Sequence, residues 1–420
     1  MIALREESSF VARVREAFAP GGLLSRASHF EYREEQQRMA EAVARALEEE
    51  RPLVVEAGTG VGKSLGYLLP AVLWAKDQRK KAVISTHTIN LQEQLLHKDL
   101  PILQKLLPVE FEAVLLKGRQ NYLCTRRLER AVENAKDLFN STEQSEIERL
   151  RDWASRTRDG TLSDLSVEPE GAVWEQVCSE PHVCTPKTCG PDSRCFYQAA
   201  RRRVVAADVV VVNHTLFFNY LALAAAGETG EGNGFLFPND FVIFDEAHTL
   251  EQVAARQIGI GVSQYGLRAA LLRLYNPKSR KGLFTVMRDS DGVKRVSDLV
   301  DRAEAFFGAV AQRTPQAGAR EFRVRQPDFV EDTLTGGLKE LLGAMSDGAR
   351  RTTDEGLKGE LQEMAGRIRD AREGIAAFLG QTAEDHVYWI ERTGRTGQFV
   401  SLNAAPVDIA AHLRPLLFSG

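Results

Sequence analysis

The segment AGTGVGKS, from Ala57 to Ser64, has the residue types and spacing of a phosphate-binding loop. Its glycines allow backbone N–H groups to converge on phosphate oxygens at the N-terminus of the helix predicted to follow. Lys63 is predicted to reach the β- and γ-phosphates, and the Ser64 hydroxyl to bind Mg²⁺. A glycine-rich turn without a ligand is the alternative interpretation of the loop taken alone. The predicted nucleotide-contacting residues are Ala57, Gly58, Thr59, Gly60, Val61, Gly62, Lys63 and Ser64.

A second set of candidate catalytic residues, Asp245-Glu246-Ala247-His248, directly follows an apolar run. Asp245 is predicted to bind Mg²⁺ through its water shell, and Glu246 to orient and deprotonate the attacking water. His248 is predicted to sense the γ-phosphate and couple it to nucleic acid. An Asp-Glu pair after a strand is also common as the charged start of a helix. Paired with the upstream loop, however, these residues predict an ATPase site.

Arg33 and Gln36 precede the phosphate-binding loop at the beginning of a helical pattern. A glutamine amide can form two hydrogen bonds with the edge of an adenine base. The position of these residues shortly before the loop therefore predicts adenine recognition. An ordinary charged helix start is the alternative interpretation.

The chain has five cysteines, four of which are clustered in the sequence. In a chain without an export signal, this clustering favours metal ligation over disulfides. Cys184, Cys189 and Cys195 lie in a loop that can wrap its sulfur atoms around one centre, and Cys124 could complete a set of four. Cys178 is left over. Four thiolates suit either zinc or an iron–sulfur cluster, and reduced buried cysteines without a metal are a third possibility.

Basic and aromatic side chains accompany the cysteines in the sequence. Arginines can contact phosphates while aromatic rings stack on bases, which favours binding of single-stranded DNA. A solvated charged face is the alternative interpretation. The residues are Lys117, Arg119, Arg126 and Arg127 around the first cysteine, Arg201, Arg202 and Arg203 after the last, and the interleaved Tyr122, Phe196 and Tyr197.

Short apolar runs alternate with helical patterns in the parts of the chain that must position these residues. The alternation predicts a parallel, doubly wound α/β sheet, with ligands at the carboxyl ends of its strands. From Gly259 to Glu384 the pattern is mainly helical, and heptad-like spacing over 357–378 indicates helix packing. The strands are predicted at 53–55, 81–86, 111–116, 209–212 and 241–244, with strand structure again from His386 and a last helix over 406–418.

The bulk composition is that of a soluble globular protein, with 43% hydrophobic and 27% charged residues. A length of 420 residues predicts two or three compact units. The net charge of −4 means that a nucleic-acid surface must be a local patch. The N-terminus lacks a secretory signal pattern, and Asn213, His214 and Asn219 interrupt the longest apolar run. We therefore expect a cytoplasmic, monomeric protein with no membrane span.

Taken in order, these motifs resemble the iron–sulfur helicases of superfamily 2, the XPD-like group, and within it the bacterial DinG type. The resemblance covers most of the chain from Phe30 to His248. The matching stretches are Arg33-x-x-Gln36, AGTGVGKS, STHTINLQEQL, KGRQNYLC, the trio Cys184, Cys189 and Cys195, ADVVVVNHTL and DEAH.

The resemblance implies an ATP-driven motor that moves 5′→3′ on single-stranded DNA and unwinds duplex junctions in DNA repair or replication. Its implied cofactors are ATP, Mg²⁺ and a [4Fe–4S] cluster. The cluster ligands would be Cys124, Cys184, Cys189 and Cys195, with Cys178 outside the ligand set. The expected DNA-contacting residues are Thr86, Thr88, Gln92, Arg119, Asn121, Tyr122 and Arg201.

The implied domain order is a RecA-like motor domain with helices on both faces of its sheet (1–117), an iron–sulfur domain (118–204), a second motor segment (205–258), a helical arch (259–384) and a return to the motor domain (385–420). The sequence contains no second parallel-sheet pattern, so we expect an N-terminal portion that lacks the second RecA-like domain. Because such motors stabilise the transition state from two domains, this chain should hydrolyse ATP poorly. The alternatives are a non-catalytic module that binds single strands or junctions, and a phosphate-loop ATPase with a structural zinc.

Overall fold

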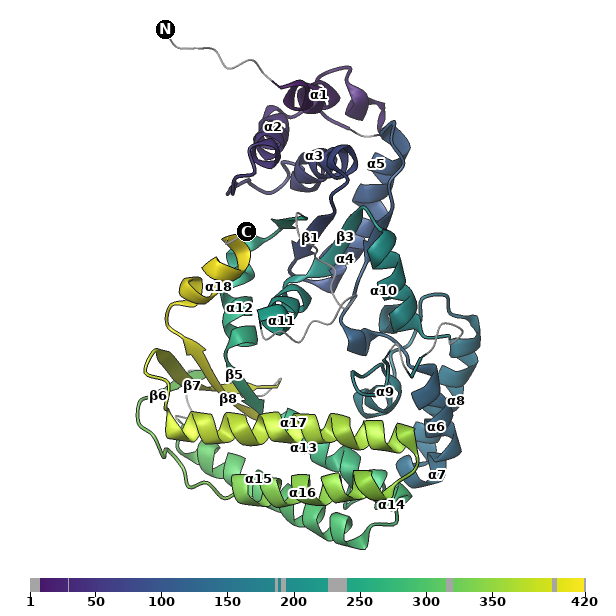
Figure 1. Cartoon of the computed structure of the whole chain (residues 1–420), viewed down its shortest axis with the longest axis vertical. Helices are drawn as coiled ribbons and strands as arrows, with labels where there is room; N and C mark the ends of the chain where they lie inside the picture. The colour runs from purple at the N-terminus through teal and green to yellow at the C-terminus, as the bar shows by residue number, and fades with distance from the viewer. Residues whose placement is uncertain are drawn as a thin grey trace. The chain divides into compact units, whose positions relative to one another are not determined.

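The computed structural model describes residues 8–28, 30–185, 188–189, 194–225, 240–314, 320–394 and 399–418. The chain divides into two compact units, whose elements are labelled in Figure 1. Unit 1 comprises Met1–Lys117 and Ala200–Leu250, and unit 2 comprises Gly118–Ala199 and Glu251–Gly420. Within the described ranges, no helix is long and apolar enough to cross a membrane.

Unit 1 is built on a parallel sheet, which has four strands in the order β2-β3-β1-β4 in the described part of the chain. β1 lies between β3 and β4, so that Thr86 is level with Asn213 and Ser85 with Phe244. β3 is a run of valines because its residues are buried on both faces of the sheet. The strands are β1 (Ala82–Thr86), β2 (Ala113–Leu115), β3 (Val209–Asn213) and β4 (Phe241–Phe244).

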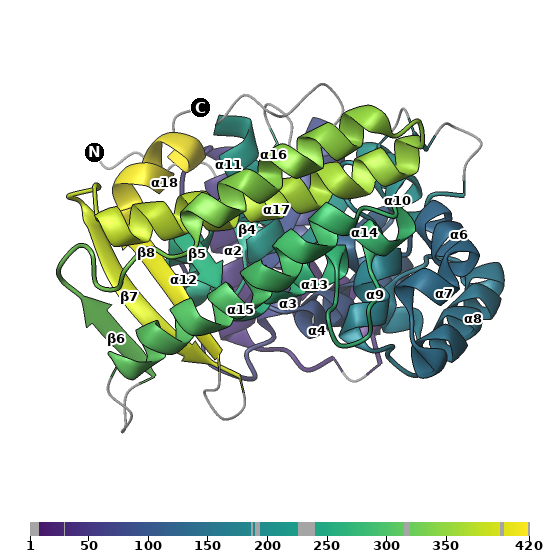
Figure 2. The ribbon, with the colours of Figure 1, turned by 90° about the horizontal axis from the view of Figure 1, so that it is seen from below.

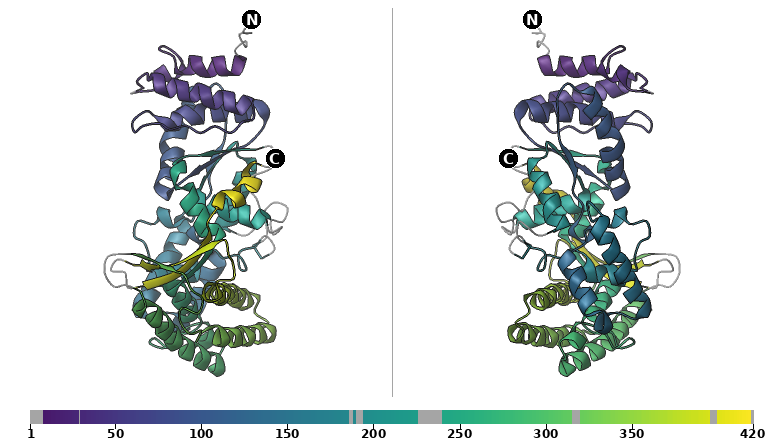
Figure 3. Two further views of the ribbon diagram at one scale, coloured as in Figure 1. Left: turned by 90° about the vertical axis from the view of Figure 1, so that its left-hand side faces the viewer. Right: turned by 90° about the vertical axis from the view of Figure 1, so that its right-hand side faces the viewer.

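Helices pack on both faces of this sheet. On one face, Ile84 and Val211 share a hydrophobic core with α1, α2, α3 and α5; the N-terminal helices of this layer are purple in Figure 3. On the other face, the Phe244 ring lies 5.0 Å from that of Phe217 and 6.4 Å from that of Phe218, centroid to centroid. The helices of unit 1 are α1 (Ser9–Phe18), the 3-10 helix η1 (Leu23–Arg26), α2 (Glu34–Glu48), α3 (Lys63–Gln78), α4 (Ile89–Gln94), the π-helix η2 (Leu95–Asp99), α5 (Leu100–Leu106), α11 (His214–Ala225) and the 3-10 helix η5 (Ala247–Thr249).

The strand predicted at 53–55, immediately before the phosphate-binding loop, is wrong. The structure assigns no strand to 51–58, and Val54 is 95% exposed. An apolar run of three residues between Arg51 and Glu56 buries too little side-chain surface to fix a strand register on its own. The other predicted strands of this unit are confirmed, although β2 is shorter than expected.

Unit 2 contains an antiparallel sheet, which in the described residues has the order β5-β8-β7-β6. β7 and β8 pair along their full length, from His386 opposite Pro406 to Thr393 opposite Phe399. Strand structure from His386 and a last helix are thus confirmed, but β7 and β8 belong to this sheet and not to the parallel one. The strands are β5 (Ile260–Ser263), β6 (Glu321–Val324), β7 (His386–Thr393) and β8 (Phe399–Pro406).

Long amphipathic helices of unit 2 pack beside this sheet around a single large core (Figure 2). The heptad-like spacing predicted over 357–378 lies in α17, which packs along α16. The helices that come after β4 in the sequence are α12 (Leu250–Ile258), α13 (Gln264–Leu274), α14 (Leu283–Val286), α15 (Ser290–Gln312), α16 (Thr335–Arg351), α17 (Glu355–Gly380) and α18 (Ile409–Phe418).

Short helices carry the cysteine-containing segment of unit 2. α8 begins at a capping box, in which the Asn140 side chain accepts from the Glu143 backbone N–H and the Glu143 carboxylate accepts from that of Asn140. The elements are the 3-10 helix η3 (Arg119–Asn121), α6 (Thr125–Glu133), α7 (Ala135–Leu138), α8 (Ser141–Arg156), the 3-10 helix η4 (Leu162–Asp164), α9 (Gly171–Val177) and α10 (Phe196–Ala206), which ends in unit 1.

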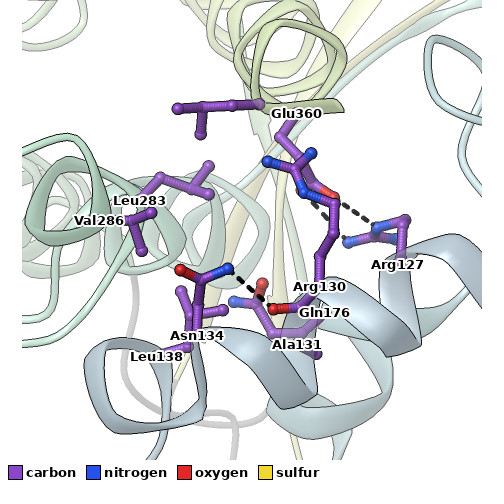
Figure 4. A pocket seen from close by; sticks show the side chains of 10 residues that line it. Arg127, Arg130, Ala131, Asn134, Leu138, Gln176, Leu283, Val286 and Glu360 are labelled. Atoms are coloured by element: carbon purple, nitrogen blue, oxygen red, sulfur yellow. Dashed lines mark hydrogen bonds and ion pairs between the residues drawn. The ribbon is translucent and has the colours of Figure 1, made fainter. Parts of the chain in front are cut away.

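A buried network of arginines and glutamates joins this segment to the long helices of unit 2. Arg127 of α6 donates through Nε to Glu360 of α17 at 2.7 Å, a pair visible in Figure 4 beside a small cavity. Glu180 accepts from Arg273 of α13 at 2.7 Å and from Arg367 of α17 at 2.8 Å. Burial favours a protonated Glu360, but Arg273 and Arg127 lower the pKa of its carboxyl to about 2. The carboxyl of Glu360 is therefore ionised at neutral pH.

Candidate nucleotide site and cysteine cluster

The phosphate-binding loop leads directly into α3. Gly60 and Gly62 both have φ of +83°, and Gly62 is the residue before the first helical position, Lys63. Glycine adopts this left-handed conformation without the strain that a Cβ would cause. A Cβ on Gly62 would also lie 2.3 Å from Nε2 of Gln36. The positive φ therefore favours glycine at this position, and a larger residue would also displace the Gln36 side chain.

Arg33 and Gln36 bond to the loop itself. Gln36 is 4% exposed, and its Nε2 donates to the Gly62 carbonyl at 2.7 Å. Arg33 donates to the Gly60 carbonyl. Adenine recognition by these two residues stays a prediction, but in this structure their side chains brace the backbone of the loop. That role is invisible in the sequence because it depends on the three-dimensional approach of α2 to the loop.

The two halves of the predicted ATPase site meet in unit 1. Lys63 Nζ lies 3.2 Å from Glu246 Oε1, and Oγ1 of Thr86 donates to Oδ2 of Asp245 at 3.2 Å. His248 Nδ1 lies 3.4 Å from the other oxygen of Glu246. These contacts arise because β1 and β4 are neighbours and end at the same edge of the sheet. The structure thus brings together the four residues predicted to be catalytic.

Glu246 has a strained backbone, with φ of 55° in the left-handed region that residues other than glycine rarely adopt. Such strain is concentrated at functional sites, where the surrounding structure enforces it. Here the Asp245 backbone N–H donates to the Ser85 carbonyl at 2.8 Å and fixes the turn after β4. The turn directs the Glu246 side chain to Lys63.

The Asp245 carboxyl has a pKa raised above its ordinary value, chiefly because it is buried. The hydrogen bond from Thr86 and the charge of Lys63 oppose this shift, whereas the charge of Glu246 adds to it. A buried carboxylate with incomplete compensation gains from a nearby cation. The residues present therefore fit the Mg²⁺ that was predicted at Ser64 and Asp245.

Sequence analysis missed His214 as part of this site. It follows β3, its Nδ1 lies 2.7 Å from Oγ of Ser85, and its Nε2 is buried without a hydrogen-bond partner among the described residues. Burial, reinforced by the nearby His87, lowers the pKa of His214 to about 4, so the ring is neutral at pH 7. The position of His214 in the sequence NHT, directly after a predicted strand, could have indicated that it lies at the site. Tyr67 and Asp99, which lie beside Ser64, were also missed.

The cysteines form a compact buried group in unit 2. The sulfur atoms of Cys184, Cys189 and Cys195 all lie within 4.8 Å of one another, and Cys124 belongs to the same cluster. None of these cysteines forms a disulfide. Cys178 is also buried but lies outside the cluster, against Arg127, and burial raises the pKa of its thiol to about 11. Cys184, Cys189 and Cys195 thus lie together, Cys124 packs against them and Cys178 lies apart, while the four-cysteine ligand set stays a prediction.

The thiols of the cluster influence one another's ionisation. Hydrogen bonds from Cys124, Cys189 and Cys195 lower the pKa of the Cys184 thiol, while the same contacts raise the pKa of the three others. Three buried sulfurs within 4.8 Å of one another, with Cys124 packed against them, are a donor set that suits a [4Fe–4S] cluster or zinc, either of which stabilises thiolates directly. Residues 186–187 and 190–193 of this loop lie outside the described residues.

Several predicted DNA-contacting residues are engaged within their own unit. Tyr122 is 2% exposed and packs edge-on against Tyr197, with ring centroids 5.6 Å apart. Arg119 donates to the Cys184 carbonyl at 2.7 Å and lies over the Tyr197 ring. Asn121 donates to the Gly118 carbonyl at 3.1 Å. In this conformation these side chains order the cysteine segment.

In unit 1, the predicted DNA-contacting residues differ in exposure. Thr86 and Gln92 are fully buried, and the Gln92 amide has no hydrogen-bond partner in the described part of the chain. Thr88 is exposed and caps α4 by accepting from the Leu91 N–H at 3.2 Å. Arg201 is partly exposed on α10. Only Thr88 and Arg201 of these four are therefore accessible to a ligand as they lie.

Replacing Cys184 by alanine is expected to abolish metal binding, because this sulfur contacts the three others of the cluster. Iron and zinc content by plasma emission, together with visible absorbance, would measure the loss. Cys178→Ala is the matched control and should keep the metal of the parent protein. Unchanged metal content in Cys184→Ala, or its loss in Cys178→Ala, would contradict the ligand set.

Comparison with known proteins finds helicases that are similar to this chain in sequence. Residues 34–167 match the model of the DEAD/DEAH box helicase family. ATP-dependent DNA helicase YoaA of Escherichia coli K12 is 43% identical over 249 residues, which cover 59% of this chain and 38% of that protein. The Haemophilus influenzae YoaA is 37% identical over 241 residues, covering 57% and 36%. ATP-dependent helicase DinG of Mycobacterium tuberculosis H37Ra is 37% identical over 265 residues, covering 58% and 38%.

Two solved structures also align with the chain. A truncated XPD gives a TM-score of 0.42 at 14% identity and covers 90% of this chain and 89% of that one. S. tokodaii Xpd4 gives a TM-score of 0.44 at 13% identity and covers 92% and 55%. The sequence matches to YoaA and DinG span less than two thirds of those proteins' own lengths. Residues 34–167 therefore carry a DEAD/DEAH box helicase domain, and the DinG and YoaA helicases are homologues of this chain.

Proposed function

We propose that the protein is an ATP-dependent DNA helicase that moves 5′→3′ on single-stranded DNA and unwinds duplex junctions in DNA repair or replication. The observation that carries the proposal is the contact of Lys63 with Glu246, which unites the phosphate-binding loop and the DEAH sequence in one site. The relatives named as ATP-dependent DNA helicases support the same activity. Such a protein would act in the cytoplasm as a monomer.

Lys63 and Glu246 would change partners when ATP binds. In this structure their side chains neutralise each other, and both are about one-third exposed. A γ-phosphate would attract the Lys63 ammonium more strongly than a single carboxylate does, because it carries more negative charge. Glu246 would then be free to accept a proton from the attacking water. His248, which contacts Glu246, would respond to the loss of the Lys63–Glu246 contact. The loop N–H groups at the start of α3 would bind the phosphate oxygens.

Mg²⁺ would be held by Ser64 and, through water, by Asp245, and when bound it would neutralise charge on the phosphates. Thr86 positions Asp245 through its hydrogen bond. Because Thr86 ends β1 and Thr88 caps α4, a strand of DNA bound at Thr88 would be two residues from Thr86, which bonds to the carboxylate of Asp245. This connection offers a physical route between DNA binding and ATP hydrolysis.

The second cofactor we propose is a [4Fe–4S] cluster on Cys124, Cys184, Cys189 and Cys195. Cluster binding would lock Cys124, which precedes α6, to the loop that ends at Cys195, which precedes α10. The basic side chains flanking these cysteines would bind DNA phosphates. Arg126, Arg202 and Arg203 are exposed and therefore accessible.

We further propose that unit 1 forms one wall of the ATP site and that a second RecA-like domain forms the other. In the described residues, Glu246 pairs with a lysine and a histidine, and the chain shows one parallel sheet with one phosphate-binding loop. DNA-stimulated ATPase activity of the 420-residue chain should then be weak. Robust turnover by this chain alone would contradict the two-domain site.

Substitution of Lys63 by alanine tests the nucleotide site. ADP affinity, measured with a fluorescent analogue, should fall at least about 100-fold because the lysine–phosphate contact is lost, whereas affinity for a single-stranded oligonucleotide should be unchanged. Lys76→Ala is a matched control on α3, since Lys76 pairs with Asp208 away from the loop. Equal ADP affinity in Lys63→Ala and wild type would contradict the proposal, and a wild-type chain that binds DNA but no nucleotide would indicate a DNA-binding module.

The colour of the purified protein tests the second cofactor. A brown protein with visible absorbance would support an iron–sulfur cluster over zinc.

A further inference from the structure

A carboxylate outside every motif described above, Asp99, lies beside the serine of the phosphate-binding loop. It interacts with the Ser64 side chain and is close enough to Asp245 for the two charges to influence each other. Its Oδ2 atom is buried and has no hydrogen-bond partner in the described part of the chain. A buried carboxylate oxygen without a donor is unfavourable unless something absent from the polypeptide compensates it.

A second polar group points into the same place. Tyr67 is 3% exposed, and its hydroxyl has no hydrogen bond of standard geometry with any described residue. The hydroxyl faces Ser64, Asp245 and Asp99. Because Tyr67 is on α3, one turn after Ser64, helical geometry places both side chains on the same face. The side chains of two carboxylates and two hydroxyls therefore converge beside the phosphate-binding loop, where Tyr67 is buried and Ser64, Asp99 and Asp245 are half-buried.

The backbone around Asp99 is built unusually. Residues Leu95–Asp99 form the π-helical turn η2 between α4 and α5, and Asp99 is its last residue. A π-helical turn inserts an extra residue per turn and re-aims the side chains that follow, and such turns are frequent at functional sites. A regular α-helix over the same residues would place the Asp99 carboxylate elsewhere on the helix surface. The wide turn is therefore what brings Asp99 to Ser64.

We propose that Asp99 and Tyr67 complete the divalent-cation side of the nucleotide site as positioning residues. Asp99 accepts a hydrogen bond from the Ser64 hydroxyl or from a cation-bound water, which directs the serine oxygen lone pair to the cation. The Tyr67 hydroxyl donates a hydrogen bond to the carboxylate of Asp99 or Asp245 and keeps that carboxylate oriented. The inference rests on the proposed function and deepens it, since it specifies how this chain selects a cation that carries its own water.

The test measures cation binding directly. Mn²⁺ is titrated into the 420-residue chain with saturating ADP, and free Mn²⁺ is followed by electron paramagnetic resonance. Asp99→Asn should weaken Mn²⁺ binding about 10- to 100-fold, the usual effect of losing a residue that orients a metal ligand. ADP affinity in EDTA should equal that of wild type. This separation of cation from nucleotide affinity is a result that loss of structure would not give.

Asp77→Asn is the matched control, because Asp77 lies on α3 and pairs with the exposed Arg13. It should bind Mn²⁺ as wild type does. Tyr67→Phe removes only the hydroxyl and should weaken Mn²⁺ binding in the same direction, which provides a second variant if Asp99→Asn folds poorly. Wild-type Mn²⁺ affinity in either Asp99→Asn or Tyr67→Phe overturns the inference. Failure of the proposed function gives a different result, since the wild-type chain would then bind neither ADP nor Mn²⁺ with ADP.

Discussion

Replacing Glu246 by glutamine is expected to slow ATP hydrolysis about 10²- to 10⁴-fold, the usual contribution of a positioned general base. Glutamine keeps the size of the side chain but cannot accept the proton of the attacking water. The variant also removes the partner of Lys63, so ATP should bind at least as tightly as in wild type. A single-turnover assay with protein in excess over labelled ATP detects hydrolysis even when turnover is weak.

The control for this prediction is Glu251→Gln, which removes an exposed carboxylate five residues further along the chain. It should leave both hydrolysis and ATP affinity unchanged. If Glu246→Gln hydrolyses ATP at the wild-type rate, Glu246 is not the base. If the variant instead loses ATP affinity, the carboxylate contributes to binding in a way that its contact with Lys63 does not suggest.

Replacing Arg273 by methionine is expected to lower the free energy of unfolding of unit 2 by about 3–5 kcal/mol, the cost of leaving a buried charge unpaired. Glu180 is fully buried and Glu360 nearly so, and both accept from Arg273. Arg127 and Arg367 remain, but they cannot replace both of its contacts. Urea unfolding followed by circular dichroism measures the change.

Arg295→Met is the matched control, because Arg295 pairs with Glu340 on the exposed surface of α15 and α16. Such a surface substitution should change the free energy of unfolding by no more than about 0.5 kcal/mol. Equal effects of the Arg273 and Arg295 substitutions would show that the buried network contributes no more than a surface ion pair.

Acid should also weaken the network, because the lowered pKa of Glu360 gives a stabilising contribution that is full above about pH 5 and is lost as the pH falls towards 2.

The parallel sheet was predictable because its strands appear as short, largely apolar runs between helical patterns, and its central strands β1 and β3 are buried on both faces. β4, for example, begins and ends where the run Phe241–Phe244 does. Once the strands are parallel, their carboxyl ends share one edge, so the meeting of Lys63 with Glu246 could be expected from the sequence alone. The strand predicted at Leu53–Val55 failed because three apolar residues do not specify a partner strand.

Other features of the site could not be predicted, because they depend on contacts between residues distant in the sequence. Gln36 has a suitable side chain for adenine, yet its amide bonds to the Gly62 carbonyl. Tyr122 belongs to a basic and aromatic segment typical of a DNA surface, yet it is buried against Tyr197. Asp99 lies in a helical pattern that gives no sign of a π-helical turn. Sequence spacing indicates which residues could do chemistry, whereas packing decides which of them face a ligand.

The ion network of unit 2 makes the cysteine segment and the long helices one cooperative folding unit. Glu180 lies four residues before Cys184, and its carboxylate is neutralised by arginines of α13 and α17. If either the cysteine segment or the long helices unfolded, charged side chains in the other part would lose their ion-pair partners. Excised cysteine segments would therefore not reproduce the ligand geometry of the intact chain. If the cysteines bind a metal as proposed, its removal should be detectable as faster hydrogen exchange in α17, far along the sequence from the cysteines.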